Sequence, residues 1–412
     1  MELVKKQWNI LIEYYRKQKY EESKNKEYSK ELFPTLLIDH KKTAICSPTT
    51  YRKLAAGEIL KNDDIYVLLL EKLGFHYVED AYVYSEVFQE DCRKIRFYLE
   101  AHEYENLYAY LESTLSKLTS EDIIEKEYHI VMSAIYDMLQ RNKNGDSPHM
   151  KHIADLFTMY NEEVKQCLDV PIYNYCVMQH LDRKIPYYLS QVENTPFHRV
   201  HVLYYQIDDN VELDKVEEEM SELIKYYEDK KNYNMLLNLY TMKMKYYYWI
   251  GKDSDEVVKE IDTFIKVHQD KISKRMNNSY LYFKAKKYNR EKEYVKAKGT
   301  FEELLRNDAS FISNVLGYYF NCLLMLDERV IYDDRLTIYF KNKDEIIYRY
   351  FQIPIEDYQK RETYIMKQLC VGDVLKREYL AKSFLFELRK IVKETKHYVL
   401  LDKYLEKTDD FL

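Results

Sequence analysis

The chain has 412 residues, too many for one ordinary hydrophobic core, which indicates several domains or an array of repeats. Glycine and proline are scarce: the chain has 7 of each, whereas average usage predicts about 29 glycines and about 20 prolines. This scarcity favours long helices and argues against glycine-rich nucleotide-binding loops. Residues 1–75, called the head below, carry 14 basic and 11 acidic side chains, whereas the whole chain has a net charge of −7. A mildly basic head therefore precedes an acidic body, which is expected when only the head contacts nucleic acid.

The first 20 residues predict an amphipathic helix, because their large apolar residues recur at helical spacing. The segment is charged throughout and lacks the apolar run of a secretion signal. No run of about 18 apolar residues occurs in the sequence, so no membrane span is expected. Six scattered cysteines without a C-x-x-C pair indicate reduced, mostly buried thiols, and these features together predict a cytoplasmic protein.

A polar stretch then leads to a short apolar segment, residues 31–38, in which Pro34 is expected to occupy a first helical turn. The next helix is expected over residues 48–56, because Ser47 is a natural N-cap and Gly57 a natural stop. A proline follows the cap at the first helical position, where its missing N–H is harmless.

A further helix is expected over residues 64–73, with Asn62 or Asp63 as its cap and Gly74 as its stop. Its leucines and isoleucine form one apolar stripe that can pack on the preceding helices. Short helices of this length near the start of the chain are typical of a helix-turn-helix DNA-binding domain.

Helix 48–56 has the composition of a recognition helix, whose first turns enter the major groove of DNA. Such positions need short polar and cationic side chains that bond base edges and phosphates, while the opposite face packs on the domain core. The residues expected at the DNA are Lys42, Ser47, Thr49, Thr50, Tyr51, Arg52, Lys53 and Lys61. Tyr51 and Leu54 are also available to pack inward, and the whole pattern fits an ordinary capped surface helix as well.

The stretch from Ile45 to Gly74 resembles the helix-turn-helix of peptide-pheromone-responsive transcriptional regulators of Gram-positive bacteria, the Rgg and PlcR type. The shared pattern is a Cys46-Ser47 turn, a recognition helix that ends near Gly57, and a further helix that ends in Leu-Gly. The resemblance implies sequence-specific binding of double-stranded DNA by a homodimer. It also implies that a short secreted signalling peptide controls this binding from tetratricopeptide-like repeats.

The chain departs from the family pattern inside the head. The family pairs an arginine of its first helix with a glutamate two residues before the glycine, but this chain has Ala55 there. Arg16 is therefore expected to lack its acidic partner. These departures keep open an alternative interpretation, in which the repeats form a protein-interaction adaptor and the degenerate head no longer binds DNA.

Beyond about Val78 the pattern changes to long amphipathic helices joined by short polar links, which is typical of helical hairpins stacked as a superhelix. The clearest hairpin is expected over residues 278–306. There Ala297 and Phe301 resemble the small and aromatic positions in the second helix of a tetratricopeptide repeat. A second, weaker hairpin is expected over residues 233–267.

The predicted fold is therefore all-α, with a helix-turn-helix domain over residues 1–75 and a right-handed superhelix of tetratricopeptide-like hairpins over residues 78–412. The second domain is expected to bind the peptide and to dimerise. The family clamps the peptide backbone with asparagine side chains, because an amide both donates and accepts hydrogen bonds. The candidates here are Asn234, Asn238, Asn278, Tyr280 and Asn321, each of which also fits an ordinary structural residue.

Two pairs of histidines are spaced for a metal on one helix face, His149 with His152 and His198 with His201. No third ligand follows at a recognisable spacing, so neither a metal nor a cofactor is expected. No local signature of nucleophilic catalysis occurs, and a helical enzyme would require a pocket of clustered titratable groups that the sequence does not indicate. The expectation is therefore a protein that is not an enzyme.

Overall fold

The computed structural model describes residues 2–35, 44–76, 81–119, 122–139, 147–208, 215–328, 345–370 and 380–408. Within these residues the regular structure is helical, and the β-type pairing consists of one isolated parallel bridge between His76 and Asp122. The predicted all-α class is confirmed. Residue contacts divide the chain into two compact units, Met1–Met235 and Leu236–Leu412, which are described separately below.

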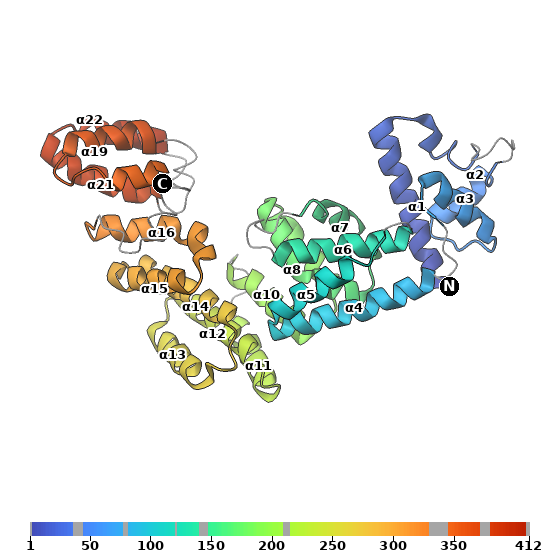
Figure 1. Cartoon of the computed structure of the whole chain (residues 1–412), viewed down its shortest axis with the longest axis horizontal. Coiled ribbons are helices and arrows are strands. Elements are labelled where there is room, and N and C mark those ends of the chain that lie inside the picture. Colours follow the sequence, from blue (N-terminus) through green and yellow to red (C-terminus); the bar gives the residue numbers. More distant parts are fainter. Residues whose placement is uncertain are drawn as a thin grey trace. The chain divides into compact units, whose positions relative to one another are not determined.

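The helices follow one another along the chain (Figure 1). Those of the first unit are α1 (Glu2–Ser23), α2 (Pro48–Ala55), α3 (Asp63–Leu73), α4 (Ala81–Ala101), α5 (Tyr104–Leu115), α6 (Ile123–Leu139), α7 (Met150–Leu156), α8 (Glu162–Met178), α9 (Ile185–Leu189), α10 (Pro196–Asp208) and α11 (Val216–Asp229). Those that follow are α12 (Tyr233–Trp249), α13 (Asp255–His268), α14 (Lys274–Arg290), α15 (Tyr294–Asn307), α16 (Ile312–Met325), α18 (Glu345–Phe351), α19 (Tyr358–Tyr364), a π-helix (Ile365–Leu369), α21 (Leu380–Thr395) and α22 (Val399–Thr408).

The first three helices form a head with an aromatic interior. Trp8 of α1 packs against Tyr66 of α3 with ring centroids 5.6 Å apart, and both side chains are buried. The ends of α3 follow the sequence signals, because the Asn62 side chain accepts a hydrogen bond from the backbone N–H of Asp64 at 3.0 Å. Gly74 then ends the helix with a φ of 84°, a left-handed conformation that glycine adopts without strain.

The short helix expected over residues 31–38 is not formed where the structure describes it, since residues 31–35 are turns. The turns carry Phe33 into the core, where its ring centroid lies 5.5 Å from that of Tyr51. Lys72 of α3 donates to the backbone oxygen of Phe33 at 2.7 Å. Within the segment, single backbone hydrogen bonds run from Phe33 N–H to the oxygen of Ser29 at 2.9 Å and from Thr35 N–H to that of Leu32 at 3.0 Å. These bonds and the tertiary contacts hold turns rather than a continuous helix, and the remainder of the expected helix lies outside the described residues.

The rest of the first unit is a layered packing of long helices. Helix α4 packs along α5 and α8, and α6 lies against α5 and α8 as well. Helix α10 pairs with α11. Helix α1 also contacts α6, so the head and the helices that follow it belong to one compact unit.

The second unit contains both of the hairpins that the sequence predicts. Helices α14 and α15 pair over the expected residues 278–306, and α12 shares a hydrophobic core with α13. On α15, Ala297 and Phe301 are fully buried. The small side chain of Ala297 leaves room for a close approach of α14, and the ring of Phe301 fills the space beside it.

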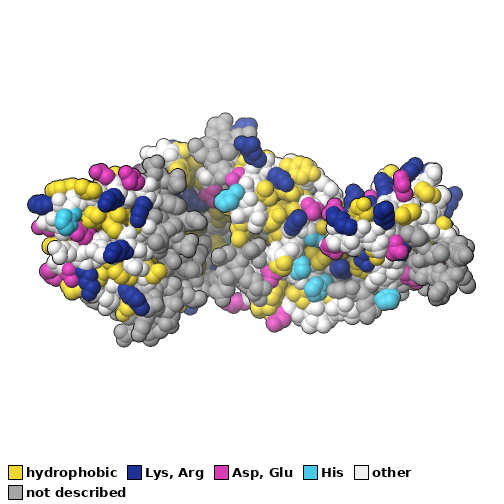
Figure 2. Space-filling model, turned by 90° about the horizontal axis from the view of Figure 1, so that it is seen from above, with side chains coloured by type: hydrophobic (Ala, Val, Ile, Leu, Met, Phe, Trp, Pro, Cys, Tyr) yellow, Lys and Arg dark blue, Asp and Glu magenta, His cyan; other side chains and the backbone are white. Residues whose placement is uncertain are grey.

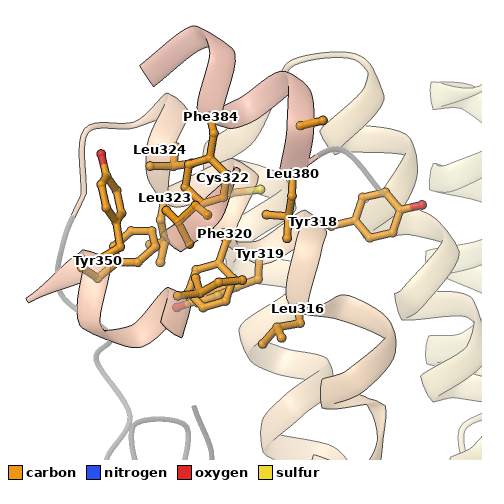
Figure 3. Packing of buried hydrophobic residues seen from close by; sticks show 14 of the residues in the cluster. Leu316, Tyr318, Tyr319, Phe320, Cys322, Leu323, Leu324, Tyr350, Leu380 and Phe384 are labelled. Atoms are coloured by element: carbon orange, nitrogen blue, oxygen red, sulfur yellow. The ribbon is translucent and has the colours of Figure 1, made fainter. Parts of the chain in front are cut away.

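Helix α16 is the centre of the largest described core of this unit. Its apolar side chains from Val315 to Leu324 are buried on several sides, against α15, α18 and α21 (Figure 3). Tyr350 of α18 and Phe384 of α21 meet edge to face with centroids 5.6 Å apart. Such mixed aromatic and aliphatic packing supplies most of the stabilisation available to a helical array.

All six cysteines are buried free thiols, as the sequence predicts. Among the helices that the structure describes, none is both long enough and apolar enough to cross a membrane.

Candidate functional site

Helix α2 carries most of the residues expected to contact DNA, and local chemistry determines where it begins. The hydroxyl of Ser47 accepts a hydrogen bond from the backbone N–H of Thr50 at 3.0 Å and lies 2.9 Å from the hydroxyl of Thr50. Pro48 follows as the first helical residue. The capped end is exposed, so the unsatisfied N–H groups and the positive end of the helix dipole face solvent.

The outer face of α2 is polar and basic. Thr49, Arg52 and Lys53 are exposed and Thr50 is half-buried. Lys53 Nζ lies 3.9 Å from a carboxylate oxygen of Glu58, a solvated pair that contributes little and leaves the lysine able to move. Arg52 forms no ion pair with any residue that the structure describes. This face is therefore a set of donors and cations open to a large partner.

Other basic side chains of the head extend this surface. Lys61 is exposed in the turn before α3, whereas Lys42 lies outside the described residues. Figure 2 shows lysine and arginine side chains gathered, with a few acidic ones, on the visible face of the end that α1–α3 form in Figure 1. The cationic character predicted for residues 1–75 is thus present on the surface.

Tyr51 faces the opposite way and is fully buried, which corrects the expectation that it contacts DNA. Its hydroxyl donates to Glu13 Oε2 on α1 at 2.8 Å. Arg16 donates to the same carboxylate through Nε and Nη2, each at 2.8 Å. Burial opposes ionisation of Glu13, but the hydrogen bonds from Arg16 and Tyr51 outweigh it and hold the pKa of Glu13 below its ordinary value. The inner face of α2 is thereby tied to α1.

The same network supplies the acidic partner of Arg16. The expectation that Arg16 lacks an acidic partner is wrong, because Glu13 supplies the carboxylate from one helical turn earlier on α1. Arg16 also donates to the backbone oxygen of Tyr28. The signal was present in the sequence as an acid and a base three residues apart on one helix, a spacing that places them side by side.

A second buried network joins α1 to the helices that follow the head. Glu127 of α6 accepts a hydrogen bond from the hydroxyl of Tyr15 at 2.7 Å and one from Tyr160 at 3.1 Å. The Nε2 atom of His152 lies 2.9 Å from both carboxylate oxygens. Burial, followed by the charge of Glu127, raises the pKa of both phenols, so they stay protonated and donate. Sequence reasoning missed this cluster because its members come from four separate segments.

Asn234, a candidate for peptide binding, has a structural role. Its Nδ2 donates to the backbone oxygen of Ala101 at 3.0 Å, and Asn232 Nδ2 donates to that of Glu100 at 2.8 Å. These two carbonyls end α4 and have no partner within their own helix. The two amides therefore terminate α4, and a peptide would have to displace Asn234 to use it.

The other candidates lie on α12, α14 and α16. Tyr280 is buried and its hydroxyl donates to Asp262 Oδ1 on α13 at 2.7 Å. Asn238 is 7% exposed and Asn278 is 1% exposed. Neither side-chain atom of Asn278 has a hydrogen-bond partner among the described residues. Unpaired buried amides are uncommon in native proteins, so Asn278 is the candidate whose bonding capacity is unused.

Asn321 belongs to a buried polar chain that crosses three helices. Its Nδ2 donates to Asn289 Oδ1 of α14 at 3.0 Å, and its Oδ1 accepts from the hydroxyl of Ser383 of α21 at 2.7 Å. Asn289 in turn donates to the backbone oxygen of Tyr318 at 3.1 Å. Asn321 is thus used in packing α14, α16 and α21 together, and is not displayed on a surface.

The histidine pair on α10 has a partner that the sequence does not reveal. The Nδ1 atoms of His198 and His201 each lie 2.8 Å from Asp169 Oδ2 on α8. Burial opposes ionisation of Asp169, but the two imidazoles outweigh it and lower its pKa. When neutral, each ring must donate from Nδ1, so Nε2 is the acceptor. The three side chains join α8 to α10.

A cavity of about 460 Å³ lies against His198 between α9 and α10. Its walls are mainly apolar, with Leu189, Val192 and Val202 among them. The volume suits a small organic molecule. Among the described residues, no group of three or more histidine, cysteine or acidic side chains is arranged to hold a metal ion.

Comparisons with models of known protein families, with curated proteins and with solved structures found no match.

Proposed function

We propose that this protein is a sequence-specific DNA-binding transcriptional regulator whose helical body binds a short signalling peptide. The observation that carries the proposal is the two-sided character of α2. Its inner face is tied to α1 through Tyr51 and Glu13, and its outer face presents Thr49, Arg52 and Lys53 behind a capped, exposed start. A recognition helix needs this combination of a rigid seat and free polar side chains.

The peptide half of the proposal is supported by the helical hairpins of the second unit. Consecutive hairpins that stack as tetratricopeptide-like repeats form a superhelix whose first helices line a concave groove. Asn238 of α12 and Asn278 of α14 are on such first helices. Asn234, Asn321 and Tyr280 are removed from the list of ligand contacts, because their polar atoms serve internal hydrogen bonds.

The DNA half is tested with purified full-length protein and a labelled duplex from the region upstream of its own gene. Fluorescence anisotropy is recorded against an unlabelled unrelated duplex as competitor, and at several salt concentrations. Selective binding whose affinity falls steeply with salt is expected, because phosphate contacts release counterions. The measurement is repeated with candidate peptides, since a bound peptide shifts the population between conformers of different DNA affinity.

Arg52→Ala is the decisive variant. If Arg52 reads a base edge, its loss weakens binding to the specific duplex by about 1–3 kcal/mol and relaxes the preference over the competitor. Lys225→Ala, at an exposed position of α11, removes the same charge outside the head and serves as the matched control. Equal affinities of the Arg52 variant and the control would remove Arg52 from the interface.

The adaptor alternative predicts a different result from the same experiment. A folded protein with no DNA selectivity and no steep salt dependence, with or without peptides, would favour a repeat protein that binds another protein. The mass of the protein in solution, measured by light scattering, tests the proposed homodimer in either case.

A further inference from the structure

A second, unrelated surface feature lies in the second unit, between α18 and the helical segment formed by α19 and the π-helix. It is a pocket of about 300 Å³. Three of its lining side chains are cationic, Arg349, Lys360 and Lys367, and Thr363 and Gln368 add polar groups. None of the lining residues is acidic. The pocket is therefore lined by cationic and polar side chains, on a chain whose net charge is −7.

The two lysines that line the pocket are available to a ligand. Lys360 and Lys367 are exposed, and neither forms an ion pair with a residue that the structure describes. Lys360, Thr363 and Lys367 all line the pocket from the segment that α19 and the π-helix form. Cations that line the same pocket repel each other. An anion bound between them is attracted to each cation and also reduces their mutual repulsion.

The walls of the pocket are held from behind by buried contacts. The hydroxyl of Tyr364 donates to the backbone oxygen of Ile346 at 2.8 Å, which joins α19 to α18. On the inner face of α19, Arg361 is buried against Glu387 of α21, and Tyr350 donates to the same carboxylate at 2.6 Å. The basic face of α19 is thus presented by a helix that cannot easily rotate away.

The helical geometry changes within the pocket itself. The π-helix Ile365–Leu369 contains both Lys367 and Gln368, and its wider turn is closed by a hydrogen bond from the backbone N–H of Cys370 to the oxygen of Ile365 at 2.8 Å. A π-turn is less favourable than continued α-helix and is found frequently at functional sites. Here it determines where Lys367 lies relative to Lys360.

We propose that this pocket binds a small molecule that carries a phosphate or diphosphate group. A dense oxyanion of two or more negative charges matches the two lysines, and its oxygens accept hydrogen bonds from their ammonium groups and from the hydroxyl of Thr363. The volume is at the lower end of the range for ligand sites, which favours a compact anion over a large apolar ligand. This site is independent of the DNA interface proposed on α2.

The test is isothermal titration of the full-length protein with inorganic pyrophosphate at low salt. We expect saturable binding that weakens when the ionic strength is raised from about 0.05 M to about 0.5 M. The double variant Lys360→Gln/Lys367→Gln should bind about ten-fold or more weakly, since two charge-assisted contacts are lost. The matched control, Lys259→Gln/Lys266→Gln on α13, removes two exposed lysines with the same seven-residue spacing and should change affinity less than about two-fold.

Further measurements distinguish an organic from an inorganic phosphate and check that the variants fold. A nucleoside diphosphate that binds more tightly than pyrophosphate identifies an organic phosphate, and equal affinities identify the inorganic group, both in support of the site. Thermal melts followed by circular dichroism confirm that the variants fold, and Thr363→Val provides a milder change in the same pocket. Equal losses in the pocket variant and the control, absence of pyrophosphate binding at millimolar concentration, or an effect of the pocket variant on DNA binding alone would overturn the proposal.

Discussion

Seven residues that are not glycine adopt the left-handed conformation in the described part of the chain, and each follows the end of a helix. They are Lys24, His102, His180, Lys231, Lys292, Asp327 and Lys396, with φ between 53° and 64°. Glycine normally occupies this position because a Cβ atom is strained there. A chain with 7 glycines therefore ends most of these helices with lysine or histidine, and the lysine cations lie at the negative end of the helix dipole.

This substitution pattern predicts a gain in stability at Lys292. The residue is exposed and follows α14, and the next backbone N–H, that of Glu293, closes the turn to Tyr288 at 2.9 Å. Lys292→Gly should raise the free energy of unfolding by about 0.5–1 kcal/mol, because relief of the left-handed strain exceeds the added entropy of the unfolded chain. Urea unfolding followed by circular dichroism measures the change.

The control for that prediction is a lysine-to-glycine substitution at a residue whose backbone has the right-handed helical conformation. Lys259 is exposed in the interior of α13, and Lys259→Gly should lower stability by about 1 kcal/mol. Opposite signs for the two substitutions are the expected outcome. A loss at both positions would show that the backbone at Lys292 is not strained.

At the residue scale, the sequence predicted helix ends well and side-chain partners poorly. The caps at Ser47 and Asn62 and the stop at Gly74 depend on neighbours within a few positions, so local patterns identify them. The burial of Tyr51 and the amide contacts of Asn321 depend on helices far apart in the chain. Tertiary packing decides such contacts, and a single sequence does not contain their geometry.

At the scale of elements, α1 is important because it has two buried polar faces. Glu13 faces α2 and receives the hydroxyl of Tyr51, whereas Tyr15 faces α6 and donates to Glu127. The two contacts are two residues apart on one rigid helix. Under the proposed function, α1 is the element through which a change in the body would reach α2, because packed helices shift as units.

This arrangement predicts that replacing Tyr14 or Tyr15 of α1 by phenylalanine lowers the free energy of unfolding by very different amounts. Tyr15→Phe leaves the buried carboxylate of Glu127 without one of its donors and should cost about 1–3 kcal/mol. Tyr14→Phe retains the ring contact with His152, whose centroid lies 4.8 Å away, and should cost less than about 0.5 kcal/mol. Chemical denaturation of both variants measures the difference, and equal costs would mean that the bond to Glu127 does not stabilise the junction.

The elements themselves were predicted where the periodic pattern is long. The hairpin α14–α15 was found because apolar residues recur over several turns and Ala297 marks a close approach. Residues 31–35 were misassigned because a short apolar stretch contains too few residues to nucleate a helix alone. Phe33 is stabilised instead by contacts with Tyr51 and α3.

At the scale of the whole molecule, stability is expected to be local. In the second unit many contacts join helices that follow one another in the chain, as in α14 with α15, α15 with α16 and α21 with α22, and α21 also packs on α16 and α19. In arrays of this kind the free energy of unfolding is a sum of local terms rather than the property of a single core. A perturbation in one compact unit should therefore remain largely within that unit.

Hydrogen exchange of the full chain, read by mass spectrometry, tests this expectation with a pair of matched core variants. Phe301→Ala empties a fully buried site on α15, and Phe157→Ala does the same in the first unit, each at a local cost of about 3–5 kcal/mol. Phe301→Ala should accelerate exchange in α14, α15 and α16 while α1–α3 keep their protection. Phe157→Ala should accelerate exchange in helices of the first unit while α14, α15 and α16 keep theirs. If either variant accelerates exchange equally in both units, the chain unfolds as one cooperative body. A ligand bound in one unit would then stabilise the other unit because the two unfold together, without any change of conformation.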